Sequence, residues 1–543
     1  EDAVIGLDHA LENDATNVEL LTCKGYSLYR LARYKETVEY LGRALKRRPK
    51  DRTVLFFRGK AYLRLGRWED AYGMFDKLTA IDPKHVKGWY YKGQALAAKD
   101  LYEDTLSAFE TVISLEETCA GAWYYKGRAL GSLARHAEAV TAFNRALELK
   151  PDQPDAAYRK GLALAAQNLH EDAVAAFDLA ATLGLDHGEL WYCRGTSLMQ
   201  LARWQEALES FNKTIALVSD NAPAWLNKGL CLQKLNYHAA AADAFEKTSA
   251  LDTTSLVAAF GRGQSLAELG RDEEAIAAFT RTLELDSTRH EAAYLRGCAY
   301  LRLANYAEAI SSFDYTIQYA PDHAQSHYRK GLALQAQGKY EKAIRSFKQA
   351  LTHDGSITDA VYQTGLCYAS LGKSDQALKT FDRVLETFPE RADVLFHKGR
   401  ALFRLLRNDE ALAAIDASLA IENNDVAVWE LKGSTLYELG RYEESLEAYD
   451  RALALTPDSI TCWYLKGRSL SDLARYEEAI PCFDRVIETD GTCAGAWLRK
   501  GSSLLSLGKF APAIEALTRS LDLKPDNANG WYDRGIALAE LKQ

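Results

Sequence analysis

The sequence predicts an all-α solenoid in which antiparallel helix pairs are stacked one after another. Sixteen glycines recur at intervals of 34 residues, from Gly25 to Gly535, without one insertion or deletion. A fixed period of about 20–50 residues is typical of a repeat array. Apolar residues make up 48% of the chain, which is ample for a packed core. No linker rich in Pro, Gly or Ser interrupts the period, so one continuous solenoid is expected.

The first helix of each repeat is predicted from positions 4, 8 and 11, when the recurring glycine is numbered position 8. These positions lie on one stripe of a helix with a period of about 3.6 residues. Position 11 is Leu or Tyr in every repeat, and glycine at position 8 lets a second helix approach closely. Position 4 is Trp in eight repeats: Trp89, Trp123, Trp191, Trp225, Trp429, Trp463, Trp497 and Trp531.

The second helix is predicted after a turn at position 15, where Gly or Asn often stands and tolerates the left-handed conformation that ends a helix. Position 20 is Ala in twelve of fifteen repeats, and position 24 is aromatic in twelve of fifteen. Residues four apart share one face of a helix, so a small residue beside a large one lets two helices interdigitate. Pro at position 32 in seven repeats ends the second helix.

The combined pattern, W-x₂-x-G-x₂-[YL]…A-x₃-F…P, resembles the tetratricopeptide repeat (TPR) family over essentially the whole chain. The chain is most similar to a prokaryotic-type array of about 15–16 TPR repeats and no other domain. The resemblance implies an α-α superhelix, a right-handed TPR solenoid of antiparallel helix pairs, whose first helices line a concave groove.

The repeat register divides the chain into three parts. Residues 1–17 are expected to hold the second helix of a truncated repeat, residues 18–527 fifteen tandem repeats, and residues 528–543 the first helix of a truncated sixteenth repeat. An array needs polar terminal caps. The single helices at the two ends therefore favour a fragment of a longer array, or ends that stack on other molecules. Repeats 8 to 12 lack Trp at position 4 and are expected to be the least stable.

Position 7 departs from the family pattern, because it is Lys or Arg in fifteen of sixteen repeats where the family usually has Leu. One interpretation is a basic stripe that binds an acidic ligand. The other is a ladder of ion pairs between helices, because position 25 is acidic in nine of fifteen repeats. Those nine acids are Asp76, Glu110, Asp178, Glu246, Asp314, Asp382, Asp416, Asp450 and Asp484.

Candidate ligand-binding residues follow from the resemblance, which implies that positions 2, 5, 9, 12 and 13 face the groove. Position 5 is aromatic in twelve of sixteen repeats, and basic residues occur one helical turn apart at positions 9 and 13. The alternatives are that the tyrosines pack between repeats and that the cations form an ordinary solvated face. The candidates are Tyr90, Tyr124, Tyr158, Tyr192, Tyr294, Tyr328, Tyr362, Lys60, Arg64, Arg128, Arg400 and Arg404.

Composition and motifs predict a protein without enzymatic activity. A net charge of −9 argues against a chain-wide nucleic-acid surface, and no apolar run reaches the ~18 residues of a membrane span. The nine cysteines have no C-x-x-C spacing, which favours reduced thiols in the cytoplasm. We find no phosphate-binding loop, nucleophile elbow or metal-ligand set, so no cofactor and no metal are expected.

The predicted function is a non-enzymatic scaffold that binds a peptide or protein segment in the concave groove. Expected partners are therefore proteins or peptides of unknown identity, with no nucleic acid and no membrane. Two alternatives remain open. In the first, the chain is a regulatory or targeting arm of a larger enzyme or assembly. In the second, it self-associates end to end through its uncapped helices. RNA binding is disfavoured by the acidic balance.

Overall fold

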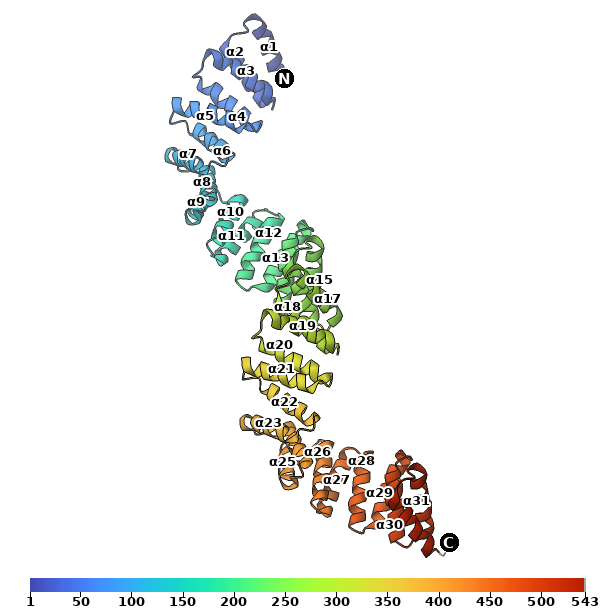
Figure 1. Cartoon of the computed structure of the whole chain (residues 1–543). Helices are drawn as coiled ribbons and strands as arrows, with labels where there is room; N and C mark the ends of the chain where they lie inside the picture. Colours follow the sequence, from blue (N-terminus) through green and yellow to red (C-terminus); the bar gives the residue numbers. More distant parts are fainter. Residues whose placement is uncertain (542–543) are drawn as a thin grey trace. The chain divides into compact units, whose positions relative to one another are not determined.

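The computed structural model describes residues 1–541, and within that range it contains thirty-two α-helices and no β-strand (Figure 1). This confirms the predicted all-α array of helix pairs. The helices are α1 (Asp2–Asn13), α2 (Val18–Arg30), α3 (Tyr34–Arg47), α4 (Arg52–Arg64), α5 (Trp68–Ile81), α6 (Val86–Ala97), α7 (Tyr102–Leu115), α8 (Ala120–Ser132), α9 (His136–Leu149), α10 (Pro154–Ala165), α11 (His170–Thr182), α12 (Gly188–Gln200), α13 (Trp204–Leu217), α14 (Ala222–Lys234), α15 (His238–Leu251), α16 (Leu256–Glu268), α17 (Asp272–Leu285), α18 (His290–Arg302), α19 (Tyr306–Tyr319), α20 (Ala324–Ala336), α21 (Tyr340–His353), α22 (Thr358–Ser370), α23 (Ser374–Thr387), α24 (Ala392–Arg404), α25 (Asn408–Ile421), α26 (Val426–Glu438), α27 (Tyr442–Leu455), α28 (Ile460–Asp472), α29 (Tyr476–Thr489), α30 (Ala494–Ser506), α31 (Phe510–Leu523) and α32 (Ala528–Glu540).

The core of each repeat forms where the recurring glycine of the first helix meets the residue at position 24 of the second. A Cβ atom added to Gly93 would lie 2.6 Å from a ring atom of Phe109, which is fully buried. The same contact joins Gly127 to Phe143 and Gly229 to Phe245. Glycine is therefore needed at these three positions because any side chain would collide with the ring, as the sequence predicts.

The residue at position 15, which follows the first helix, takes the left-handed conformation at all fifteen places where this position occurs within residues 1–541. Glycine takes this conformation at Gly66, with φ of +71°, and asparagine takes it at Asn168, with φ of +60°. Five repeats place Ala there instead, for example Ala134 with φ of +58°. A residue with a Cβ atom adopts this conformation at a cost, which tertiary packing offsets.

In the eight repeats that have Trp at position 4, the indole N–H bonds the first helix to the turn before it. Nε1 of Trp89 donates a hydrogen bond to the carbonyl oxygen of Pro83, at position 32 of the preceding repeat, with 2.9 Å between the atoms. Seven of the eight tryptophans make this bond. Trp191 instead donates to Oδ1 of Asp186, after a second helix, α11, that is one residue shorter than its equivalents.

The basic residues at position 7 form an ion-pair ladder with position 25 of the preceding repeat. All nine predicted acids are paired, with N···O distances from 2.5 to 3.4 Å. Lys24 and Asp8 form a tenth pair of the same kind. The position-7 cation also lies over the Trp ring of its own repeat in all eight cases, 4.6 to 5.8 Å from the ring centroid. The ladder interpretation is confirmed for these rungs.

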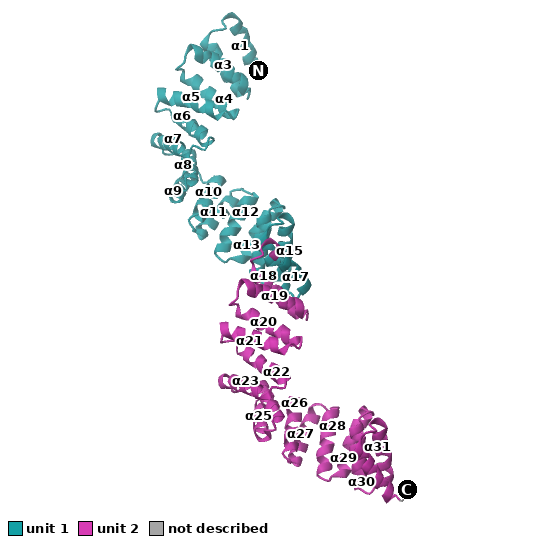
Figure 2. Cartoon of the chain, in the orientation of Figure 1, with its two compact units in different colours: residues 1–281 teal, residues 282–543 magenta. Residues whose placement is uncertain are grey.

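Two compact units make up the chain, residues 1–281 and residues 282–543, and their border falls within α17 (Figure 2). Inside each unit, consecutive helices pack against each other, and neighbouring first helices such as α6 and α8 also touch. The predicted partition into fifteen full repeats in one continuous solenoid stays a prediction. No helix in the described range is both long enough and apolar enough to cross a membrane.

Candidate functional site

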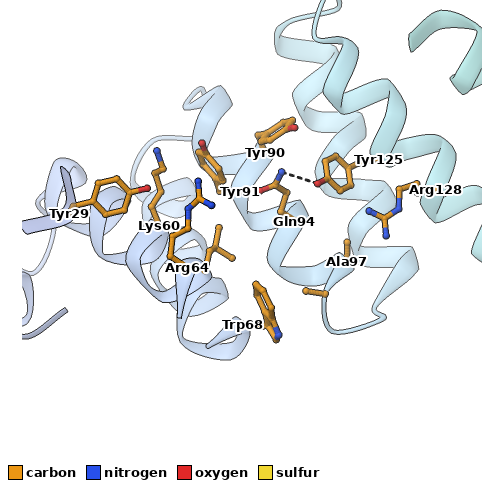
Figure 3. A pocket seen from close by; sticks show the side chains of 12 residues that line it. Tyr29, Lys60, Arg64, Trp68, Tyr90, Tyr91, Gln94, Ala97, Tyr125 and Arg128 are labelled. Atoms are coloured by element: carbon orange, nitrogen blue, oxygen red, sulfur yellow. Dashed lines mark hydrogen bonds between the residues drawn. The ribbon is translucent and has the colours of Figure 1, made fainter. Parts of the chain in front are cut away.

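A pocket of about 590 Å³ opens on the first helices α2, α4, α6 and α8, all in the unit formed by residues 1–281 (Figure 3). Its lining comes almost entirely from positions 5, 6, 9, 12 and 13, because residues three and four apart share one face of a helix. The lining residues are Tyr29, Lys60, Leu63, Arg64, Trp68, Tyr90, Tyr91, Gln94, Ala97, Ala98, Tyr125 and Arg128.

Stacked rings hold the wall of this pocket in place. The ring of Tyr91 stacks on buried Phe75 with centroids 5.7 Å apart, and the ring of Tyr125 stacks on buried Phe109 with centroids 4.9 Å apart. Tyr90 stands edge-on between Tyr91 and Tyr125, at interplanar angles of 90° and 88°. Each ring therefore has one side against the core and another toward the pocket, and little side-chain entropy is left to lose on binding.

A hydrogen bond links two neighbouring repeats across the pocket. Nε2 of Gln94 donates to the hydroxyl oxygen of Tyr125, with 3.1 Å between them (Figure 3). Burial raises the pKa of Tyr90 and of Tyr125, so both hydroxyls stay protonated at neutral pH and act as hydrogen-bond donors. The amide and the two hydroxyls give the aromatic wall a few fixed polar groups, which is the usual composition of a recognition site.

The charge of the pocket is entirely positive. Lys60, Arg64 and Arg128 line it, and no acidic residue does. The ammonium of Lys60 lies 5.2 Å from the ring centroids of both Tyr29 and Tyr91, and the guanidinium of Arg128 lies 5.3 Å from that of Tyr125. Cations held over aromatic faces in this way remain free to bind a carboxylate. The site thus combines apolar surface with positive charge.

The structure brings together four of the residues predicted from the sequence: Lys60, Arg64, Tyr90 and Arg128. Tyr124 lies next to them, because the guanidinium of Arg128 is 5.8 Å from its ring centroid and the Arg159 guanidinium donates to its hydroxyl. A second cavity of about 230 Å³ continues from Arg128 along α8 and α10.

The tyrosines at position 5 mostly serve the core. All seven candidates pack against the aromatic residue at position 24, with ring centroids 5.6 to 6.2 Å apart. Tyr158 and Tyr362 are only 7% and 9% exposed, so little of either ring is accessible, and their role in ligand binding stays a prediction. Tyr192, Tyr294 and Tyr328 are half-buried and lie outside this pocket. Because positions 5 and 24 belong to the same repeat, these seven rings pack within their own repeat, and the alternative of packing between repeats stays a prediction.

Arg400 and Arg404 lie on α24, in the unit formed by residues 282–543. The guanidinium of Arg400 lies 5.6 Å from the ring centroid of Phe396, and burial lowers its pKa. Arg404 is exposed, and its Nη1 donates to the carbonyl oxygen of Ala369 in α22 at 3.0 Å. This pair keeps free donors, but no aromatic wall like that of the first pocket surrounds it.

Sequence reasoning overlooked Tyr29, Tyr91, Tyr125, Gln94 and Trp68, which line the pocket with the predicted cations. A signal was present. Three successive repeats carry adjacent aromatic residues at positions 5 and 6, in the pairs Phe56–Phe57, Tyr90–Tyr91 and Tyr124–Tyr125. Of these six rings, Tyr90, Tyr91 and Tyr125 line the pocket. Within the described residues, no cluster of His, Cys, Asp or Glu could hold a metal ion.

Two family models match the repeats of this chain. A family model described as tetratricopeptide repeat matches ten stretches, and a second, described as TPR repeat, matches residues 433–473. The ten stretches are residues 24–86, 60–115, 90–154, 124–184, 192–255, 238–290, 294–360, 362–426, 464–528 and 498–543. Among curated proteins, none matches the chain.

Several solved structures are similar at low sequence identity. The APC/C hetero-tetramer Cut9–Hcn1 is 15% identical over 90% of this chain and 96% of that chain, with a TM-score of 0.35. MamA from Desulfovibrio magneticus RS-1 is 23% identical over 31% of this chain and 94% of that one, with a TM-score of 0.30. The C-terminal part of a TPR repeat-containing protein from Cytophaga hutchinsonii is 15% identical over 44% of this chain and 98% of that chain, with a TM-score of 0.39.

Proposed function

Because the chain belongs to the tetratricopeptide repeat family, we propose that it is a non-enzymatic scaffold whose pocket on α2, α4, α6 and α8 binds an extended segment of a partner protein. The family supports protein interaction in general, and the pocket supports the choice of site. The proposal places the protein in the cytoplasm, and its nine cysteines are free thiols in the structure.

The observation that carries the proposal is the pairing of a fixed aromatic wall with three cations and no acid in the lining. In a chain with a net charge of −9, such a pocket attracts segments that carry Asp, Glu or a terminal carboxylate. Tyrosine and tryptophan supply apolar contact area with a polar edge, which is typical of protein interfaces. The partner segment therefore contains acidic residues next to apolar or aromatic ones.

Peptide display against the full chain tests this function. We expect the selected peptides to be rich in acidic and aromatic residues, and to bind Lys60→Glu/Arg128→Glu about tenfold or more weakly, since losing two charge-assisted contacts and adding repulsion exceeds ~1.4 kcal/mol. The matched control is Lys77→Glu/Lys247→Glu, which changes the net charge equally at exposed positions on second helices. Equal affinity of the selected peptides for both variants would contradict the proposed site.

A further inference from the structure

The second helix of the tenth repeat, α21, carries a basic face that no other second helix shares. Lys339, just before the helix, is followed at every third residue by Lys342, Arg345 and Lys348, over about 14 Å of helix. All four side chains are exposed, and none forms an ion pair with a residue in the described range. Glu341 is the only acid in α21. These four cations are called the α21 basic face.

In eight other repeats, the positive charge at the start of the second helix is neutralised by an acid. Arg at position 16 pairs with Asp or Glu at position 19 in these repeats, with N···O distances of 2.5 to 2.8 Å. In the tenth repeat both positions are Lys, at Lys339 and Lys342. Position 19 is basic in no other repeat, and position 22 is basic only at Arg345 and Lys379.

The ion-pair ladder is also interrupted between this repeat and the next. Position 25, which is acidic in nine repeats, is basic only at Lys348. Position 7 of the following repeat, which is basic everywhere else, is Thr364. Thr364 is buried, and its hydroxyl donates to the carbonyl oxygen of Ala360 at 2.7 Å. Lys348 is thus freed from the ladder and left at the surface.

Two cavities are lined in part by residues of α21. One, of about 360 Å³, is lined by Lys339, Lys342 and Arg345 together with Ile310 and the buried Leu334. Its single acid, Asp314, is already paired with Lys330 at 2.5 Å.

The other cavity, of about 230 Å³, is lined by Leu351, Val361 and Tyr368 together with the cations Lys348, Lys379 and Arg383. No acidic residue lines it. Cations beside apolar side chains suit a ligand that is both acidic and apolar. A polyphosphate chain has no apolar group to contact these side chains.

We propose that the α21 basic face is a second docking surface, which binds an acidic segment of a partner protein through alternating carboxylate and apolar side chains. Like charges one helical turn apart repel each other. Bound carboxylates relieve that repulsion. The surface lies on α21, with lining from α19, α20, α22 and α23 in the unit formed by residues 282–543. It is therefore separate from the pocket on α2, α4, α6 and α8 and does not depend on the function proposed for that pocket.

The array itself supplies a variant that keeps the fold and removes the face. Lys342→Glu, Arg345→Ser, Lys348→Asp and Thr364→Lys together install the residues that other repeats carry at these positions, including an ordinary ladder rung. The control, Arg451→Glu/Arg519→Glu, gives the same net change in charge at exposed positions of α27 and α31. Lys342→Gln/Arg345→Gln is a milder variant at two exposed helix positions.

The probe is a short fluorescein-labelled peptide of Glu and Leu, titrated into the full chain by fluorescence anisotropy, with its footprint located by hydrogen exchange. We expect a footprint on α21 and α23 that both face variants lose, with at least about tenfold weaker binding to the fourfold variant. The charge control and Lys60→Glu/Arg128→Glu should retain the α21 footprint, which separates this surface from the first-helix pocket.

Two results would overturn the proposal. One is an unchanged α21 footprint on the fourfold variant, because the cations would then contribute nothing to binding. The other is tighter binding of polyphosphate or a single-stranded oligonucleotide than of the peptide at α21, because the surface would then recognise phosphates.

Discussion

Lys92 and Asp76 form an ion pair between two successive repeats, with 2.8 Å between Nζ and Oδ1. The Lys92 side chain is 13% exposed and lies 4.6 Å from the ring centroid of Trp89, whereas Asp76 is half-exposed. The ammonium is therefore held by a ring of its own repeat and by an acid of the preceding one. The same kind of ion pair recurs at nine other places in the array, so the ladder joins those repeats to their neighbours in the same register.

We expect a coupling free energy of about 0.2–1 kcal/mol between Lys92 and Asp76, since one partner is well solvated. The double-mutant cycle uses Lys92→Met and Asp76→Asn, and hydrogen exchange of α5 and α6 amides reports the local free energy of unfolding. The coupling should shrink at about 1 M NaCl, where screening acts over ~3 Å. A coupling that does not change with salt would mean that packing, not charge, joins the two residues.

Two glycines of α8 should respond in opposite directions to alanine. A Cβ atom at Gly127 would lie 2.7 Å from the Phe143 ring, so Gly127→Ala overpacks the core and should cost about 1–3 kcal/mol. No atom lies within 4 Å of a Cβ atom added at Gly131, so Gly131→Ala should stabilise α8 by up to ~1 kcal/mol through helix propensity. Hydrogen exchange of α8 and α9 amides measures both. Similar losses in both variants would contradict the packing role of position 8.

The sequence predicted the helices, the turns and the ladder because each depends on residues at fixed spacing. It did not predict which tyrosines line the pocket, because that depends on contacts between neighbouring repeats. Tyr90 lines the pocket, whereas Tyr158, at the same repeat position, is buried. The pocket also depends on Tyr91 and Tyr125, whose stacking on Phe75 and Phe109 is a contact between repeats that no single repeat encodes.

His397 should make the stability of α24 depend on pH. Burial, with the charge of Arg400 beside it, lowers the pKa of His397 from 6.5 to about 4. Between these values the unfolded chain binds more protons than the folded chain, so the free energy of unfolding rises with pH. The stability present at pH 7 is lost as the pH falls from about 6.5 to about 4, by at most ~3 kcal/mol.

The measurement is hydrogen exchange of α24 amides at pH 7 and about pH 5, corrected for the intrinsic rate. The control is His397→Phe, because Phe57 occupies the equivalent position in the second repeat. The variant should lose the local pH dependence while keeping ring contacts like those of His397 with Phe381 and Phe396. The same pH dependence in the variant would assign it to other groups.

Repeats 8 to 12 should exchange amide hydrogens fastest at the turns before their first helices. Ala259, Ala293, Val361 and Leu395 stand where eight other repeats have Trp, so they cannot donate the indole hydrogen bond to the turn. In the tenth repeat, His327 Nε2 lies 3.0 Å from the carbonyl oxygen of Pro321 and takes the place of that bond. Its turn should therefore be better protected than the turns of the neighbouring repeats.

Leu395→Trp tests the cause of this difference. An indole at this position should donate to the carbonyl of Pro389, as Trp463 does to that of Pro457, and slow exchange at the turn by about fivefold, for one net hydrogen bond of ~1 kcal/mol. Leu395→Phe is the control, since it adds a ring without the N–H donor. Equal protection in both variants would assign the effect to ring packing, and uniform exchange along the array would contradict the weakness of repeats 8 to 12.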